Sequence, residues 1–190
     1  MSRIQTDKEI LGAISADSWM MKVLATVSKL DLPDWWIGAG FVRNKVWDKI
    51  FDLEKRTPLG DIDVVFFDPK NQSEAREIEH ESRLSKVMLG EKWSVTNQAR
   101  MHLVNDDKIY RSSADAIAAW PETATSIAVR ISDNRLELLA PHGVDDLVAG
   151  IVRPTPRFEQ KKEQYLVRQT KKNWRVKWPG LKLISPWEKE

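Results

Sequence analysis

Two aspartates, Asp61 and Asp63, are separated by one residue and directly precede an apolar run, Val64–Phe67. In a β-strand, residues i and i+2 point to the same face, about 6 to 7 Å apart. Two carboxylates placed in this way can hold a pair of divalent cations, and Mg²⁺ prefers oxygen ligands. The alternative is structural, with Asp61 capping a turn and Asp63 forming a surface ion pair. The apolar run favours the metal, because acids at the mouth of a buried strand need a compensating cation.

A glycine-containing segment, Gly38-Ala39-Gly40, comes earlier and leads directly into a predicted helix. Backbone amides at a helix start bind anions, and glycine lets a phosphate approach closely. Arg43 and Asn44 fall in the first turn of this helix, where a guanidinium can bind phosphate oxygens bidentately. The dinucleotide fingerprint fails because Arg43 stands at its third glycine, and no Gly-Lys-Ser/Thr loop is present. The alternative is a tight turn that packs a strand against a helix.

The elements that must position these residues can be predicted from apolar periodicity. Strands and helices alternate too irregularly for a doubly wound array, which indicates the α+β class. We predict strands at 35–37, 61–67, 93–98, 124–131 and 136–140, and helical segments at 8–30, 41–51, 71–89, 113–120, 144–150 and 158–176.

The composition limits the class of protein. The chain has 190 residues, of which 42% are hydrophobic and 31% charged, as expected of one globular domain over 1–190. It has no cysteine, which excludes disulfides, a thiol nucleophile and thiolate metal sites. No apolar run approaches the 18 residues of a membrane span. We therefore expect a cytoplasmic protein with no membrane partner.

Charge is unevenly distributed along the chain. From residue 157 onward, ten Lys and Arg stand against four Asp and Glu, a net charge of +6, so residues 1–156 carry −4. In this basic, tryptophan-containing C-terminal helix or tail, cations are interleaved with Tyr165, Trp174 and Trp178. Such interleaving is typical of single-stranded nucleic-acid binding. The alternative, which the apolar spacing favours, is a solvated helix whose aromatic side chains pack on the domain.

The glycine segment with Arg43 and Asn44, together with the Asp pair and its apolar run, resembles the nucleotidyltransferase superfamily of the DNA polymerase beta type. The chain is more similar still to an uncharacterised bacterial group of nucleotidyltransferase-like proteins. Nearly the whole chain takes part, since further matching segments lie at 97–102, 115–121, 123–125, 140–147, 178–179 and 186–187.

The resemblance implies a small mixed β-sheet with flanking helices, in which the glycine turn and the Asp pair face one cleft. It also implies transfer of a nucleoside monophosphate from a nucleoside triphosphate to an acceptor hydroxyl, with release of pyrophosphate. Asp61 and Asp63 would hold one or two Mg²⁺ ions, which neutralise phosphoryl charge. The implied nucleotide-binding residues are Gly38, Gly40, Arg43, Asn44, Asn97 and Arg100.

The chain departs from the superfamily pattern at two points. Ala39 separates two glycines where the superfamily has Gly-Gly or Gly-Ser. A third catalytic acid is expected on a later strand, and either Glu137 or Asn97 stands at that position. Glu137 keeps the charge and is our prediction, although it also fits an outward residue of an amphipathic strand. If Asn97 is the counterpart, the site lacks an acid.

Three functions follow from these alternatives. The first is a magnesium-dependent nucleotidyltransferase acting on an acceptor that the sequence does not identify, whether small molecule, protein or RNA. The second is a catalytically depleted module of the same fold that binds or senses a nucleotide. The third is a nucleic-acid-binding protein that uses residues 157–190.

Overall fold

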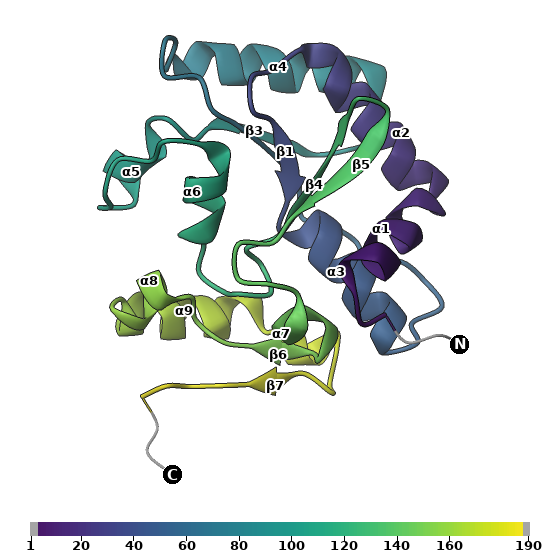
Figure 1. Cartoon of the computed structure of the whole chain (residues 1–190), viewed down its shortest axis with the longest axis vertical. Helices are drawn as coiled ribbons and strands as arrows, with labels where there is room; N and C mark the ends of the chain where they lie inside the picture. The colour runs from purple at the N-terminus through teal and green to yellow at the C-terminus, as the bar shows by residue number, and fades with distance from the viewer. Residues whose placement is uncertain (1–3, 188–190) are drawn as a thin grey trace.

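Five short strands form a mixed β-sheet, which with its flanking helices gives the predicted α+β fold (Figure 1). The structure is a computed structural model and describes residues 4–187. The strand order is β3-β2-β1-β4-β5; β2 and β3 are parallel, and the other neighbouring strands are antiparallel. The strands are β1 (Trp36–Gly38), β2 (Ile62–Phe66), β3 (Trp93–Asn97), β4 (Ala128–Ser132) and β5 (Arg135–Leu139).

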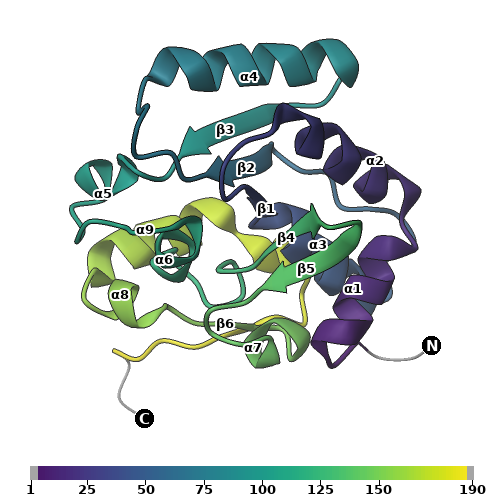
Figure 2. The same cartoon turned by 45° about the horizontal axis from the view of Figure 1, so that its top comes forward.

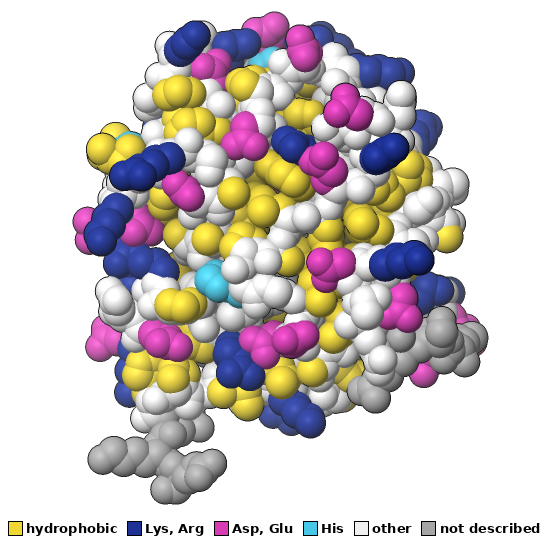
Figure 3. Space-filling model, in the orientation of Figure 1, with side chains coloured by type: hydrophobic (Ala, Val, Ile, Leu, Met, Phe, Trp, Pro, Cys, Tyr) yellow, Lys and Arg dark blue, Asp and Glu magenta, His cyan; other side chains and the backbone are white. Residues whose placement is uncertain are grey.

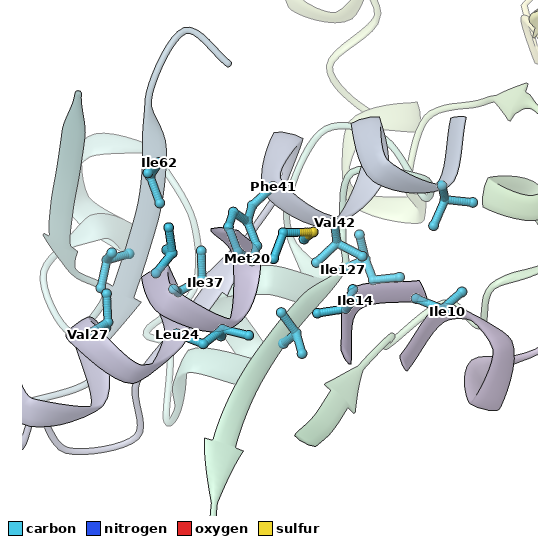
Figure 4. Packing of buried hydrophobic residues seen from close by; sticks show 14 of the residues in the cluster. Ile10, Ile14, Met20, Leu24, Val27, Ile37, Phe41, Val42, Ile62 and Ile127 are labelled. Atoms are coloured by element: carbon cyan, nitrogen blue, oxygen red, sulfur yellow. The ribbon is translucent and has the colours of Figure 1, made fainter. Parts of the chain in front are cut away.

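Four helices cover one face of this sheet and enclose the main hydrophobic core. They are α1 (Asp7–Ser15), α2 (Ser18–Val27), α3 (Gly40–Ile50) and α4 (Glu74–Val87). Figure 4 shows apolar side chains of α1 and α2, spaced by one helical turn, directed at the strands and at α3. Ile10 and Ile14 of α1 and Leu24 of α2 are fully buried there. This packing, rather than intrinsic helix propensity, supplies most of the stability of such short helices.

The opposite face of the sheet is covered only in part. Trp36, Val65 and Ala128 on this face pack against Ile117 of α6 (Ser113–Ala118) in a small second cluster. The chain after β5 forms a further layer, which lies below α6 and the sheet in Figure 1 and is seen from another side in Figure 2. This layer contains α7 (Asp145–Val148), β6 (Ile151–Val152), α8 (Pro156–Glu159), α9 (Lys162–Lys172) and β7 (Lys182–Leu183), with β6 and β7 parallel.

The break between α1 and α2 has a clear physical cause. Asp17 caps α2 by accepting a hydrogen bond from the Met20 amide at 3.1 Å. The same carboxylate pairs with Lys45 of α3 and with Arg56. Burial raises the pKa of Asp17, but the hydrogen bonds from Lys45, Met20 and Arg56 outweigh it and lower the pKa to about 2. Asp17 thereby joins α2, α3 and the loop before β2.

The C-terminal helix differs from its prediction. The segment 158–176 is not one helix but α8, α9 and a 3-10 turn at Trp174–Val176. Asn173 ends α9 in the left-handed conformation, with φ 41° and ψ 45°, which asparagine tolerates better than most residues. This reversal turns Trp174 back toward the domain, where it is buried.

The strand predicted over 124–131 begins only at Ala128. Residues 122–127 form a turn in which the amides of Thr125 and Ser126 donate to the Glu122 carbonyl oxygen, both at 2.9 Å. The prediction also omitted the short α5 (Met101–Val104) and the β6–β7 pair, each too brief to show a hydrophobic period.

Within residues 4–187 no single helix is long and apolar enough to cross a membrane; α1 and α2 with the turn after them pass that test only together, bent by 92°. On the face drawn in Figure 3, basic and acidic side chains are interspersed, and hydrophobic side chains occupy much of the centre of the view.

Candidate active-site cleft

A cleft of about 490 Å³ opens between the partly covered sheet face and the C-terminal segment. Asp63 and Val65 of β2 and Thr96 of β3 line it from the sheet. They alternate along their strands with Ile62, Val64 and Val95, which point into the core on the other face. The start of α3, the loop before β2, the region around Trp120 and the C-terminal segment supply the other walls.

The structure brings Asp61 and Asp63 together in this cleft. Burial and, to a smaller extent, the Asp61 carboxylate raise the pKa of Asp63 to about 6, against the opposing charges of Arg43, Lys172 and Arg168. The two neighbouring carboxylates thus repel each other, and burial of Asp63 makes its negative charge still less favourable. Carboxylate oxygens that face a cleft are suitable ligands for Mg²⁺, so Asp61 and Asp63 fit the cation that the family resemblance implies.

The glycine turn is built differently from its prediction. A Cβ on Gly38 would lie 2.6 Å from the Trp120 Cη2 atom, so Gly38 makes room for the indole ring rather than for a phosphate. Gly40 opens α3 and lines the cleft. Ala39 between them has φ 51° and ψ −120°, a conformation that normally requires glycine. The sequence therefore places alanine at the one strained position of the turn.

We expect Ala39→Gly to stabilise the protein. Relief of backbone strain worth about 1–3 kcal/mol, less about 0.5–1 kcal/mol for the greater unfolded-state entropy of glycine, gives a net gain of about 1 kcal/mol. Thermal unfolding should show a Tm higher by about 2–4 °C. Ala75→Gly on the exposed surface of α4 is the matched control and should lower the Tm. A Tm for Ala39→Gly at or below that of the wild type would show that the turn is unstrained.

Arg43 and Asn44 both lie in the cleft wall, and both are largely buried. The Arg43 guanidinium donates to Thr125 Oγ1 at 3.0 Å and to Asn44 Oδ1 at 2.9 Å. Its Cζ lies 4.5 Å from the centroid of the Trp174 ring and 5.2 Å from that of Trp47, within cation–π range. Burial lowers the pKa of Arg43 to about 10, which leaves the guanidinium charged at neutral pH. It is a cation fixed in position beside the Asp pair.

The basic C-terminal segment forms part of the cleft. Glu122 is fully buried and accepts two hydrogen bonds from Arg168, at 2.7 and 3.1 Å, and one from Gln169 at 2.9 Å. This clamp holds α9 so that Arg168 and Lys172, one turn apart, line the cleft opposite the sheet. The Asp pair therefore faces cations from α9 as well as Arg43.

The tryptophans of the tail pack on α3, as the favoured alternative predicts. Trp174 and Trp178 meet the Trp47 ring edge-on, with centroids 5.5 and 5.0 Å away. Trp178 Nε1 also donates to Asp48 Oδ1 at 2.9 Å. That alternative is incomplete in one respect, because it leaves the tail cations in solvent, whereas Arg168 and Lys172 face the cleft.

Three other predicted site residues do not line the cleft. Glu137 lies on β5 and accepts a hydrogen bond from Arg130 Nε at 2.6 Å. Asn97 is buried and holds a loop together, since its amide donates to the carbonyl oxygens of Asp68 and Asn71. Arg100 pairs with Glu77 and Glu74 of α4. Within residues 4–187 no group of three His, Asp or Glu side chains is arranged to hold a metal, so the cleft contains an acid pair without a third carboxylate.

A family model described as nucleotidyltransferase matches residues 25–183. The chain belongs to this nucleotidyltransferase family. A solved structure described as revealing a CCA-adding enzyme head domain is 35% identical, with a TM-score of 0.85, over 96% of this chain and 97% of that one. The resemblance to polymerase beta-type nucleotidyltransferases and the predicted fold are thus confirmed. No curated protein matches the chain.

Larger enzymes share the fold at lower identity. The Thermotoga maritima CCA-adding enzyme in complex with tRNA is 14% identical, with a TM-score of 0.57, over 98% of this chain and 44% of that enzyme. The Bacillus stearothermophilus CCA-adding enzyme in complex with CTP is 13% identical, with a TM-score of 0.52, over 87% and 40%. This nucleotidyltransferase chain therefore spans less than half the length of those enzymes.

Several cleft residues of this nucleotidyltransferase were missed from the sequence. Thr96 and Gln98 follow the period-2 alternation of β3. This alternation would have predicted both as cleft residues if the pairing of β3 with β2 had been known. Arg168 and Lys172 share one face of α9, and that spacing was also visible. Trp120 stood in a segment that carried the family resemblance, but the irregular chain between α6 and β4 gave no periodic signal for its place in the cleft. Glu122 lies in the same stretch and acts from outside the cleft lining, by holding Arg168.

Proposed function

We propose that the chain is a magnesium-dependent nucleotidyltransferase that moves a nucleoside monophosphate from a nucleoside triphosphate to a hydroxyl of an acceptor. The observation that carries this proposal is the meeting of opposite charges in one cleft. Two neighbouring carboxylates, Asp61 and Asp63, face Arg43, Arg168 and Lys172. Carboxylates alone would repel a triphosphate and cations alone would bind any anion, whereas their combination suits a metal-bound polyphosphate.

Asp61 and Asp63 would hold Mg²⁺, which when bound neutralises phosphoryl charge and lowers the pKa of an attacking hydroxyl. Arg43 and Lys172 would bind the phosphate oxygens, Arg43 as a fixed guanidinium and Lys172 as a mobile ammonium group. The Glu122 clamp keeps Arg168 and Lys172 on the far wall, so the chain positions the triphosphate between α3 and α9.

The reaction that this arrangement would support is a single displacement. The acceptor oxygen forms a bond to the α-phosphorus as the bond from that phosphorus to the bridging oxygen breaks. The hydroxyl proton is released and pyrophosphate leaves. Arg43 on one wall and the cations of α9 on the other would act where negative charge accumulates on the departing pyrophosphate.

The absence of a third carboxylate in the described part of the cleft favours a second candidate. In that case the chain binds a nucleoside triphosphate without turning it over, as a sensor or binding module.

The acceptor of the nucleoside monophosphate has to be found by testing a panel of compounds. RNA ends should be tested first, because a CCA-adding enzyme of the same fold is described in complex with tRNA and exposed cations of the tail, Lys171 and Arg175, lie near the cleft-lining Lys172. Proteins and small hydroxyl compounds complete the panel.

Titration calorimetry with each nucleoside triphosphate, with and without Mg²⁺, followed by assay of pyrophosphate, tests the proposal. We expect Mg²⁺ to tighten binding at least tenfold, because without it the two carboxylates repel the triphosphate. Pyrophosphate should then appear with one of the acceptors. Binding without any pyrophosphate across the acceptor panel would favour the binding module, and absence of binding would reject both candidates.

A third candidate is nucleic-acid binding by residues 157–190 alone. Its mark would be RNA affinity that falls steeply with salt and survives without Mg²⁺ or nucleotide. Arg168 is held by Glu122, and Trp174 and Trp178 are buried, so three residues of that surface are already engaged inside the protein. These contacts favour a role of the tail as part of the cleft over nucleic-acid binding by the tail alone.

A further inference from the structure

The cleft has two chemically different ends. The charged end holds Asp61, Asp63 and the cations of α3 and α9. At the other end, between α5, α6 and α8, none of the described lining residues is charged. We call this end the neutral pocket, and it is lined by Thr96, Gln98, Met101, Asn105, Trp120 and Phe158.

Contacts join the loop after α5 to α8 and to the residues that follow it, at one edge of the neutral pocket. Arg157 of α8 pairs with Asp107 just after α5, at 2.8 Å. Lys161 donates to the backbone carbonyl of Asn105. The cations near this pocket are thus engaged in its walls and leave its lining uncharged.

Trp120 gives the pocket a flat aromatic surface. The benzene part of its indole lies directly over Gly38, where no Cβ is present to push it away. The ring also packs on the cluster formed by Trp36, Val65 and Ile117, which fixes its orientation. Part of the side chain remains exposed, and it lines the cleft. A rigid, partly exposed indole of this kind is a stacking platform.

Gln98 supplies a hydrogen-bonding edge beside that platform. Only 5% of Gln98 is exposed, although it lines the cleft. Its Nε2 donates to the Thr96 carbonyl oxygen at 3.3 Å, and its Oε1 makes no hydrogen bond within residues 4–187. Asn105 is exposed; its Nδ2 donates to the Tyr110 hydroxyl at 3.3 Å, and its Oδ1 makes no hydrogen bond within residues 4–187. Two neutral amides therefore offer acceptor oxygens in this part of the cleft.

We infer that the neutral pocket binds the nucleobase of the triphosphate, stacked on Trp120 with its polar edge toward Gln98. This inference rests on the proposed function and adds that base selection resides in this chain. A base is flat, uncharged and polar at its edge, which matches an indole face and neutral amides. Asp63 pairs with Ser94, and Gln98 follows four residues later, about 13 Å along the strand direction. That separation accommodates a ribose and a base beyond a phosphoryl group at the Asp pair.

The test compares the affinity of each Mg²⁺–nucleoside triphosphate with that of Mg²⁺–tripolyphosphate, which has no base. In Trp120→Leu we expect nucleotide affinity to fall about 5- to 150-fold, the range measured for the loss of one base–aromatic stack. Tripolyphosphate affinity should stay within about twofold, which also shows that the variant is folded. Trp120→Phe keeps a stacking face and should retain most of the affinity. Gln98→Leu should reduce the discrimination among the four bases while leaving tripolyphosphate binding intact.

Equal losses for nucleotide and tripolyphosphate in Trp120→Leu would overturn the inference, as would unchanged nucleotide affinity. Unchanged nucleotide affinity with a raised KM for the acceptor would instead assign the pocket to the acceptor. A wild-type chain that binds neither ligand would reject the proposed function itself. A wild-type chain that binds both equally tightly would reject only the inference, because the base would then contribute nothing.

Discussion

Replacement of both Asp61 and Asp63 by Asn is expected to abolish nucleotidyl transfer, with a loss of at least about 10³-fold. Asn keeps the shape of each side chain but removes the negative charge that would hold Mg²⁺ in the cleft. The measurement is pyrophosphate release at saturating nucleotide and Mg²⁺. Glu137→Gln is the matched control, because it removes a carboxylate from the same face of the sheet but outside the cleft lining, where Glu137 pairs with Arg130.

The same change at Asp63 should make the protein more stable at neutral pH. Burial and the neighbouring Asp61 raise the pKa of Asp63 from 3.8 to about 6. The folded state therefore binds this proton more tightly than the unfolded state, and stability falls as pH rises through about 4 to 6. Above that window Asp63→Asn should gain about 1–3 kcal/mol, and at pH 3 it should gain nothing. An inactive variant that is less stable than the wild type at pH 7 would indicate misfolding rather than loss of a ligand.

Arg168→Met is expected to cause the largest loss of stability, about 3 kcal/mol or more. It leaves the Glu122 carboxylate, which is fully buried, with Gln169 as its remaining side-chain donor. A loss of this size lowers the Tm of a chain of this length by about 6–12 °C. Nucleotide affinity should fall as well, because α9 carries Lys172 into the cleft. Thermal unfolding and calorimetry measure the two effects.

A double-mutant cycle separates the buried charge from the packing of α9. Glu122→Gln combined with Arg168→Met removes both charges and should recover much of the stability lost in Arg168→Met. Lys171→Met, on the exposed side of the same helix, should change stability by less than about 0.5 kcal/mol. If Arg168→Met unfolds at the wild-type temperature, the Glu122 clamp does not hold α9.

The parts of the fold that were predictable carry local signals. Period-2 alternation and an apolar run located β2 with its Asp pair, and the glycine turn located the start of α3. The close contact of Gly38 with Trp120 could not be seen in the turn itself, because Trp120 lies 82 residues further along the chain. The extent of the domain, 1–190, stays a prediction.

The parts that could not be predicted depend on contacts between distant segments. Glu137 was preferred because it keeps the charge, and it does lie on the same sheet face as the Asp pair, since it pairs with Arg130, which stacks on Trp36. The sequence could not show that two strands, β1 and β4, separate β5 from β2. The Glu122–Arg168 pair spans 46 residues, so the sequence showed a basic tail without showing which carboxylate holds it.

Transfer of the α-phosphoryl group tests the central claim most directly. Wild-type protein is incubated with Mg²⁺, the acceptor panel and a nucleoside triphosphate labelled at the α-phosphate, while pyrophosphate is assayed in the same samples. We predict that label becomes attached to an acceptor in one-to-one ratio with pyrophosphate, and that both products vanish without Mg²⁺ or in the Asp61→Asn/Asp63→Asn variant. Transfer that persists undiminished in that variant, or tight nucleotide binding with no label transferred to any acceptor, would contradict the account.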